Sequence, residues 1–173
     1  MCIKLANLES LLNQQLANWN VLYVKLHNYH WYVKGQNFFT LHEKFELYYD
    51  DAKLMIDELG ERILTIGAKP IATLREYLET ATIKEGNHTF NAEEMVSDLI
   101  KDYERIVQES RDVISIAEES NDQETADLFL GKIAEIEKML WMLKLSHFLV
   151  VIFPHPLILK VQTVQLILSW TQL

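Results

Sequence analysis

Two long stretches of regularly spaced apolar side chains constrain the fold of this chain most strongly. Residues 8–33 and 45–66 both carry large apolar side chains at steps of three and four, and Gly35 and Gly67 follow shortly after them. In an α-helix this spacing collects the apolar side chains on one face, and glycine commonly stands just past a helix end. Such a helix has to bury its apolar face against another element. The sequence therefore predicts several long helices packed together.

The rest of the chain supplies further helix signals. Thr40-Leu41-His42-Glu43 fits the capping-box pattern and predicts the start of the second helix, which Lys69-Pro70 ends. Residues 73–78 predict one short connecting helix, and Asn91 is a plausible N-cap for a third long helix that ends near residue 119. A fourth is expected over residues 123–147. This pattern predicts an all-α fold, a ferritin-like four-helix bundle with a short helix in the crossover between the second and third long helices.

Length and composition agree with one helical domain. The chain has 173 residues, enough for one well-buried domain, and its five glycines and three prolines are too few for a loop-rich all-β fold. Its net charge of −9 argues against electrostatic binding to nucleic acid or to an anionic membrane, and suits the collection of cations. Cys2 has no second cysteine to pair with, and no signal peptide follows Met1, so we expect a cytoplasmic protein.

The C-terminal segment differs in composition from the rest. We therefore divide the chain into a ferritin-like bundle, residues 1–147, and an atypical apolar tail, residues 148–173, in which Lys160 is the only formally charged residue. Pro154 and Pro156 interrupt the tail, which argues against a transmembrane helix. The tail could be an added packing segment, an interface element, or the product of a shifted or extended reading frame. It could also have cost the bundle its ability to form larger assemblies.

Two pairs of metal-binding residue types lie on the predicted second helix. His42 and Glu46 are spaced i, i+4, as are Asp57 and Glu61, so each pair projects from one helical face. Imidazole and carboxylate together suit iron, zinc or manganese. From His42 to Asp57 is 15 residues, or about 22 Å along a helix, so a metal shared by both pairs needs a second copy of the chain. The alternative is a structural histidine and a solvated charged face.

Three segments carry a resemblance to a known family. His27–Gly35, Asn37–Phe45 and Asp57–Arg62, with the spacing between them, resemble the Dps-type miniferritins, the DNA-binding proteins from starved cells. The resemblance covers about residues 8 to 147. It implies a homo-oligomer, a hollow shell of twelve subunits. The protein itself would act as a ferroxidase: it would oxidise Fe²⁺, preferably with hydrogen peroxide, and store the iron inside the shell as a ferric mineral.

The resemblance also implies a site. His30 and His42 would come from one subunit and Asp57 and Glu61 from its two-fold partner, with Glu46 able to hold or relay a second iron ion. Trp31, next to His30, would act in catalysis by taking up oxidising equivalents; packing at the subunit interface is the alternative from the sequence alone. His27, about 60° around the helix from His30 at about 100° per residue, is predicted to be structural.

Two further expectations concern iron entry and DNA. Asp122 and Asp127 match positions where the family has acidic residues around three-fold pores, although acids at a helix N-terminus are also stabilised by the macrodipole. DNA-binding members often carry a Lys-rich arm, whereas here Lys4 is the only basic residue before Lys25. DNA binding is therefore not expected. A nucleoid-associated protein that coats DNA is the competing function, and the scarcity of terminal basic residues favours the iron-oxidising enzyme.

Overall fold

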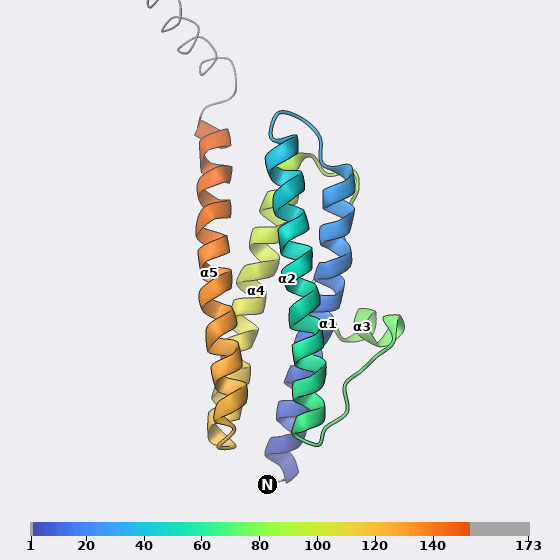
Figure 1. Ribbon diagram of the computed structural model, residues 1–173, viewed down its shortest axis with the longest axis vertical. Coiled ribbons are helices and arrows are strands. Elements are labelled where there is room, and N and C mark those ends of the chain that lie inside the picture. Colours follow the sequence, from blue (N-terminus) through green and yellow to red (C-terminus); the bar gives the residue numbers. More distant parts are fainter. Residues whose placement is uncertain (1, 153–173) are drawn as a thin grey trace, which may run out of the picture.

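The computed structural model describes the backbone of residues 2–152 and the side chains of residues 6–146. The described part is all-helical (Figure 1). Its helices are α1 (Cys2–Tyr32), α2 (Phe38–Thr65), α3 (Leu74–Thr80), α4 (Ala92–Glu119) and α5 (Gln123–Ile152). Four of them are long and α3 is a single short helix in the crossover, which confirms the predicted four-helix bundle.

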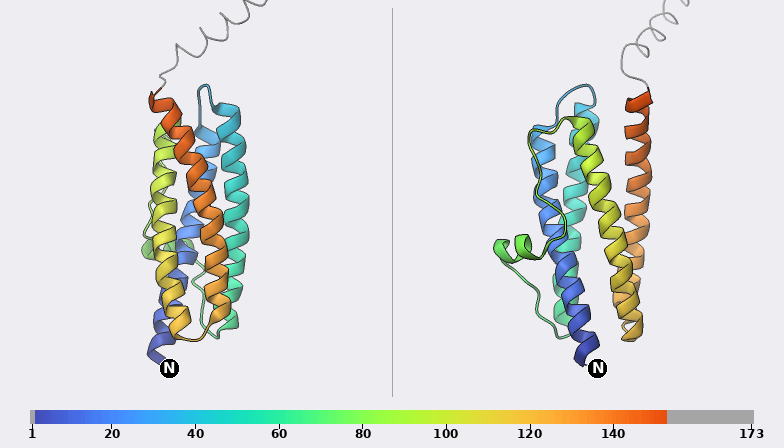
Figure 2. Two further views of the ribbon diagram at one scale, coloured as in Figure 1. Left: turned by 90° about the vertical axis from the view of Figure 1, so that its left-hand side faces the viewer. Right: turned by 180° about the vertical axis from the view of Figure 1, so that it is seen from behind.

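The long helices form two antiparallel hairpins, α1 with α2 and α4 with α5 (Figure 1). The crossover after α2 runs back along the bundle, so α4 starts at the same end as α2. On its way it carries α3 against the side of α1, away from α5 (Figure 2). Asn18 of α1, fully buried, anchors this crossover by accepting a hydrogen bond from the Thr82 backbone N–H at 2.8 Å. The long connection is therefore held to the bundle at its middle.

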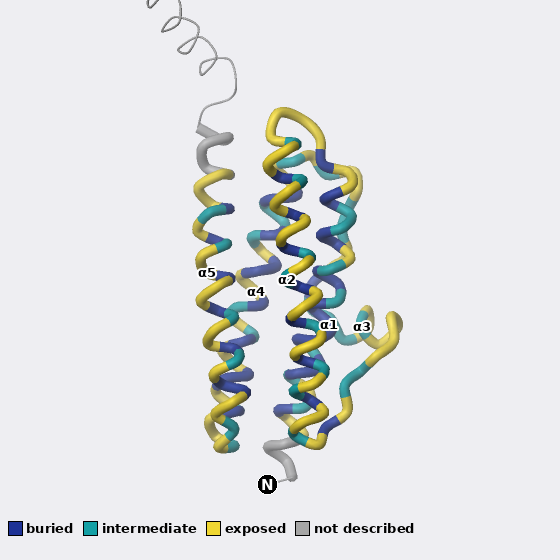
Figure 3. The backbone as a smooth tube through the Cα atoms, in the orientation of Figure 1, coloured by how far each residue is buried: buried dark blue, intermediate teal, exposed yellow. Residues whose placement is uncertain are grey.

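Each of the four long helices buries one face, as the apolar spacing predicts, and the buried positions line the inside of the bundle (Figure 3). α2 shows this most clearly. Its buried residues are Leu41, Phe45, Tyr48, Ala52, Met55, Leu59 and Ile63. The opposite face of α2 also carries large apolar side chains, which are exposed: Phe39 77%, Leu47 57%, Leu54 68% and Leu64 62%. One subunit thus leaves an apolar surface on α2 uncovered.

The start of α2 differs from the prediction. The predicted capping box at Thr40–Glu43 is wrong, because α2 begins at Phe38 and its N-cap is Asn37, which makes no side-chain capping bond. Gly35, with φ of +101°, turns the chain after α1, and its carbonyl already accepts from the Phe38 N–H at 3.1 Å. The helix therefore starts before the capping sequence. The predicted N-cap at Asn91 is confirmed, since it forms a capping box with Glu94.

The last helix is longer than predicted. α5 runs through residue 147 without a break as far as Ile152. The remainder of the predicted tail, residues 153–173, lies outside the described residues. Within the described part of the chain, no helix has the length and apolar character needed to cross a membrane.

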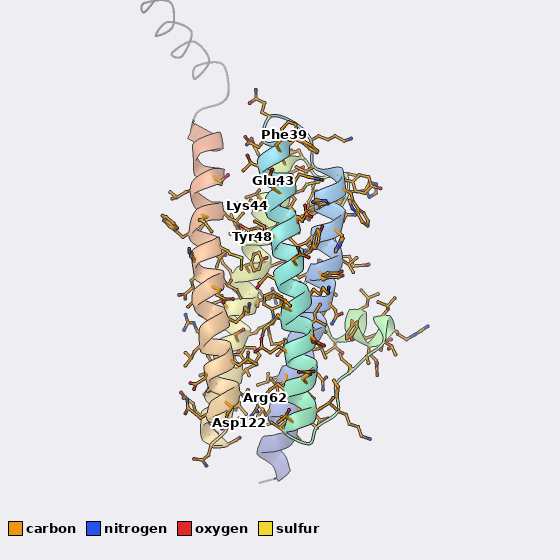
Figure 4. All side chains as sticks on the ribbon, viewed as in Figure 1. Phe39, Glu43, Lys44, Tyr48, Arg62 and Asp122 are labelled. Atoms are coloured by element: carbon orange, nitrogen blue, oxygen red, sulfur yellow. The ribbon has the colours of Figure 1, made fainter. Side chains whose placement is uncertain are left out.

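Charged side chains bridge α2 to α5 and to Asp122 directly before it. Near the end of α2, the Arg62 guanidinium pairs with Asp122 and donates from Nε to Thr125 Oγ1 at 2.8 Å. Figure 4 shows Arg62 and Asp122 at the same end of the bundle. Further along, Lys132 Nζ of α5 lies 2.9 Å from Asp51 Oδ1 of α2. These bridges link the second hairpin to the first.

Replacing Arg62 with alanine is expected to lower the free energy of unfolding by about 2 kcal/mol, the scale for partly buried hydrogen bonds to charged groups. The side chains of Arg62 and Asp122 are only 19% and 13% exposed, so solvent screens the pair weakly. Chemical unfolding followed by circular dichroism measures the loss. Arg105→Ala is the matched control: Arg105 is 56% exposed and 4.0 Å from Glu109, and its change should stay within about 0.5 kcal/mol. Equal losses in both variants would contradict the bridge's role.

A buried charge cluster joins α1 to α4. The side chain of Lys25 is 1% exposed, and its ammonium pairs with Asp102 and, at 2.8 Å, with Asp98. Tyr29 donates its hydroxyl to the same Asp98 carboxylate at 2.7 Å. Burial raises the pKa of Asp102 to about 6, although the Lys25 charge opposes the rise. One lysine thus compensates the buried carboxylate of Asp102 and the half-buried carboxylate of Asp98.

Candidate metal centre

Two predicted ligands meet at one end of the α1–α2 hairpin. His30 lies in the last turn of α1 and His42 in the second turn of α2, and the short turn between the helices brings them together. Their rings stack with centroids 3.7 Å apart and planes at 18°. His30 is buried, 8% exposed, while His42 is half-buried. The histidine pair is therefore formed within a single subunit.

Reciprocal hydrogen bonds orient the two rings. His30 Nδ1 donates to the His42 carbonyl oxygen at 2.8 Å, and His42 Nδ1 donates to the His30 carbonyl oxygen, also at 2.8 Å. A carbonyl can only accept, so each neutral ring carries its proton on Nδ1 and keeps a lone pair on Nε2. An Nδ1–H held by an acceptor is the usual support for a histidine that binds metal through Nε2. Both rings are thus prepared as metal ligands.

Aromatic side chains enclose this histidine pair. Phe38 stacks on His42 with centroids 5.0 Å apart, and Tyr49 meets the His30 ring edge-on at 5.4 Å and 89°. Glu46, one turn after His42 and three residues before Tyr49 on the same helix, is exposed. Partial burial raises the pKa of Tyr49, and the Glu46 and Asp50 carboxylates raise it further. The Tyr49 hydroxyl therefore stays protonated.

Asp57 and Glu61 lie elsewhere on the same helix. Both are exposed, and α2 is unbroken from Phe38 to Thr65, so Asp57 lies about 22 Å along the axis from His42. Within the described residues of one subunit, no group of three or more His, Cys, Asp or Glu side chains could hold a metal ion. One subunit thus carries the histidine half and the carboxylate half of the predicted ligand set at separate places.

Two aromatic residues of α1 near His30 differ in their surroundings, since Trp31 is exposed and His27 packs against Tyr49. Trp31 is 68% exposed, and its ring lies 5.5 Å from that of His27. His27 donates from Nδ1 to the Tyr23 carbonyl at 2.9 Å and stacks on Tyr49 at 3.9 Å. Sequence reasoning missed Tyr49. Its distance of seven residues from His42, nearly two full turns, is the signal that could have found it.

The predicted pore residues have local partners. Asp122 accepts from the Thr125 N–H at 3.1 Å and from its hydroxyl at 2.7 Å, and also pairs with Arg62. Burial raises the pKa of Asp122, but these hydrogen bonds and the Arg62 charge outweigh it and hold the pKa below its usual value. Asp127 is exposed and accepts from Gln123 at 3.0 Å. These contacts favour a structural role for Asp122, whereas a pore role for Asp127 stays a prediction.

Comparisons with known proteins agree with this geometry. A family model, the ferritin-like domain, matches residues 9–147. DNA protection during starvation protein 2 of Bacillus anthracis is 53% identical over 133 residues, covering 77% of this chain and 91% of that protein. The crystal structure of a Dps protein from Bacillus brevis is 49% identical, with a TM-score of 0.81 over 83% of this chain and 96% of that one.

A more distant solved structure leads to the same family. The Dps protein of Vibrio cholerae, described as a member of a broad superfamily of ferritin-like diiron-carboxylate proteins, is 38% identical with a TM-score of 0.80. The alignment covers 83% of this chain and 91% of the Vibrio cholerae chain. The matched region contains the residues of both the histidine pair and the acidic pair. The chain therefore belongs to the Dps-type miniferritins of the ferritin-like superfamily.

Proposed function

We propose that this protein is a ferroxidase that stores and detoxifies iron. It oxidises Fe²⁺, preferably with hydrogen peroxide, at sites between subunits, and deposits the ferric product inside a hollow shell of twelve chains. The stacked pair of His30 and His42 is the observation that carries this proposal, because both rings have Nδ1 committed to a carbonyl and Nε2 free. Membership of a family that includes diiron-carboxylate relatives supports iron as the metal.

The placement of ligands along α2 supports a site shared by two subunits. At about 100° per residue, His42, Glu46, Asp57 and Glu61 fall within an arc of about 100° on one face of the helix. If two copies of α2 lay antiparallel across a two-fold axis near Asp50 and Asp51, the histidine end of each would face the acidic end of the other. Exposed apolar side chains on α2, Phe39, Leu47, Leu54 and Leu64, offer the contact area for such a pair.

The ligand types suit the reaction. Two imidazoles from one subunit and the carboxylates of Asp57 and Glu61 from the other bind a divalent metal and leave positions open for an oxidant. Glu46, beside the histidine pair, would hold a second Fe²⁺. Two Fe²⁺ then give two electrons to one peroxide, which yields two Fe³⁺ and two hydroxide ions and releases no radical. Trp31, exposed beside His30, would take up an oxidising equivalent when one iron is missing.

The net charge of the chain and its single cysteine agree with the proposed substrate and the proposed compartment. The net charge of −9 attracts Fe²⁺ and argues against DNA as a partner. Carboxylates such as Asp127 would concentrate the ion at pores between subunits. The single cysteine, Cys2, fits a reducing compartment such as the cytoplasm.

Peroxide added to the anaerobic, Fe²⁺-loaded protein is expected to produce ferric absorbance much faster than in protein-free buffer, with one peroxide consumed for two Fe²⁺. Oxygen in place of peroxide should react more slowly. A native mass of twelve chains, measured on the same sample, checks the shell. Oxidation no faster than in buffer would contradict the ferroxidase, and a monomeric mass would contradict both the shell and the shared site.

A further inference from the structure

α5 carries apolar side chains on two faces. One face is buried in the bundle, as in the other long helices. The other face is exposed, and we call it the α5 stripe; its members are Leu130 (47% exposed), Ala134, Trp141 (60%) and Leu145 (48%). At about 100° per residue these four positions fall within an arc of about 60°. A helix on the surface of a single bundle normally has one apolar face, so the α5 stripe is expected to be covered by a further segment.

The described part of the chain leaves the α5 stripe open. α5 lies on the outside of the bundle, on the side away from α3 (Figure 2). Two ion pairs mark its edge with α4: Glu137 Oε1 lies 2.7 Å from a guanidinium nitrogen of Arg111, and Lys144 Nζ lies 2.6 Å from Glu104 Oε1. The large side chains of the stripe remain about half exposed or more beside these contacts, so no described element covers them.

The chain beyond α5 starts close to the stripe. α5 ends at Ile152, 11 residues or about 16 Å along the helix from Trp141. Pro154 and Pro156 follow, and because proline disfavours continuation of a helix, the sequence offers a point at which the chain changes direction. The 17 residues 157–173 are long enough to span about 25 Å as a helix and about 55 Å when extended. The α5 stripe is about 22 Å long, so this segment reaches all of it.

The composition of residues 157–173 suits an apolar surface. Ten of these 17 residues are apolar, and Lys160 is the only charged one. Residues 153–156 form a connection of only four residues, and a short connection keeps two surfaces of one chain at an effective concentration of about mM. A second copy has to be met at its far lower concentration in solution. The stripe is therefore better matched to the end of its own chain than to another chain.

We propose that residues 157–173 fold back and pack on the α5 stripe of the same chain. This assigns the atypical C-terminal segment to one of the alternatives that the sequence leaves open, an added packing segment. The stripe lies on α5 and the proposed pairing face on α2, so the packing goes beyond the proposed function and does not depend on iron. It also closes the stripe to other subunits.

Photocrosslinking in the full-length chain identifies what covers the stripe. Trp141 is replaced by p-benzoylphenylalanine, which bonds to neighbouring C–H groups on irradiation, and the product is mapped by mass spectrometry. We expect crosslinks to residues 157–173 in a product with the mass of one chain. The same replacement at Glu135, exposed on α5 about 110° around from the stripe, should give no crosslink to that segment. Any outcome at position 141 without a bond to the segment of the same chain, a two-chain product included, would overturn the proposal.

Cleavage by trypsin after Lys160 tests the stripe itself, because no other Lys or Arg follows Lys144. Replacing Trp141 and Leu145 with glutamate puts two charges on the stripe and should speed this cleavage at least about tenfold, since proteolysis follows the population of the open form. Leu74→Glu with Leu78→Glu is the matched control, because both leucines are exposed on α3 at the same i, i+4 spacing, and its rate should stay within about two-fold of the parent. Circular dichroism checks that both variants remain helical. Equal rates in the stripe variant and the parent would overturn the packing on this surface.

Discussion

Replacing Asp57 and Glu61 together with alanine is expected to abolish fast iron oxidation while leaving the subunit helical. The two carboxylates are exposed and have no part in the buried face of α2, so their loss should not disturb packing. They are also the proposed anionic ligands of the metal. The rate of ferric absorbance after peroxide addition should fall at least about 100-fold, beyond the roughly 10- to 100-fold loss typical when a group that only supports a ligand is removed.

Glu58→Ala is the matched control for that variant. Glu58 is exposed on the same helix, between the two proposed ligands, and carries the same charge. Its replacement should leave the rate within about two-fold of the parent, because a surface charge away from the metal acts only through a screened field. Circular dichroism should give the same helix content in all three proteins. Parental rates in the double variant would mean that the carboxylate half of the site is misassigned.

A mixed assembly tests whether the site is shared between subunits. Chains with His30→Ala and His42→Ala are expected to be inactive, as are chains with Asp57→Ala and Glu61→Ala. Co-expressed in equal amounts, they should recover about a quarter of the parental activity per chain, because half of randomly formed two-fold pairs are mixed and each mixed pair rebuilds one of two centres. A site formed within one chain would recover nothing.

Replacing Lys25 with methionine is expected to give the largest loss of stability, about 3–5 kcal/mol. The Lys25 side chain is 1% exposed, and its removal leaves the buried Asp102 and the half-buried Asp98 without the compensating charge of the lysine. Lys101→Met makes the same chemical change at an exposed position of α4 and should alter stability by no more than about 0.5 kcal/mol. Denaturant unfolding at one fixed subunit concentration compares the two variants. Similar midpoints would contradict the role of the cluster.

The pH dependence of this loss follows from Asp102. Its folded-state pKa of about 6 lies above its usual value of 3.8, so the folded protein holds that proton more tightly and stability from this group is lost as pH rises toward 6. Without Lys25 the folded-state pKa should rise further. Lys25→Met should therefore lose less stability at pH 5, where Asp102 takes up a proton, than at pH 7.5. Adding Asp102→Asn should recover part of the loss at pH 7.5 and little at pH 5.

The helices could be predicted from the sequence because their determinants are local. The three- and four-residue spacing over residues 8–33 and 45–66 corresponds to the buried faces of α1 and α2, and Asn91 caps α4 as expected. The start of α2 was predicted wrongly, because the turn at Gly35 lets the helix begin before the capping sequence at Thr40 is reached. A capping motif gives only a local preference for where a helix starts. Here the turn at Gly35 determines the first residue of α2.

The site was only partly predictable for a related reason. The i, i+4 pair of His42 and Glu46 follows from helix geometry alone. The stacking of His30 on His42 and the contact of Tyr49 with His30 depend on how far α1 is shifted along α2. Apolar spacing tells which side of each helix is buried, but it does not give that shift. Tyr49 was missed because its contacts with His27 and His30 are made between helices.

The unbroken α2 also fixes the distance between the two pairs of proposed ligands. It carries His42 and Glu46 toward one end and Asp57 and Glu61 toward the other, with no kink or loop between them to absorb a change in length. One residue inserted between Glu46 and Asp57 would turn the acidic pair by about 100° and shift it by about 1.5 Å. The buried face of the second half would rotate away from the core as well. This stretch should therefore tolerate many substitutions in evolution but almost no insertions or deletions.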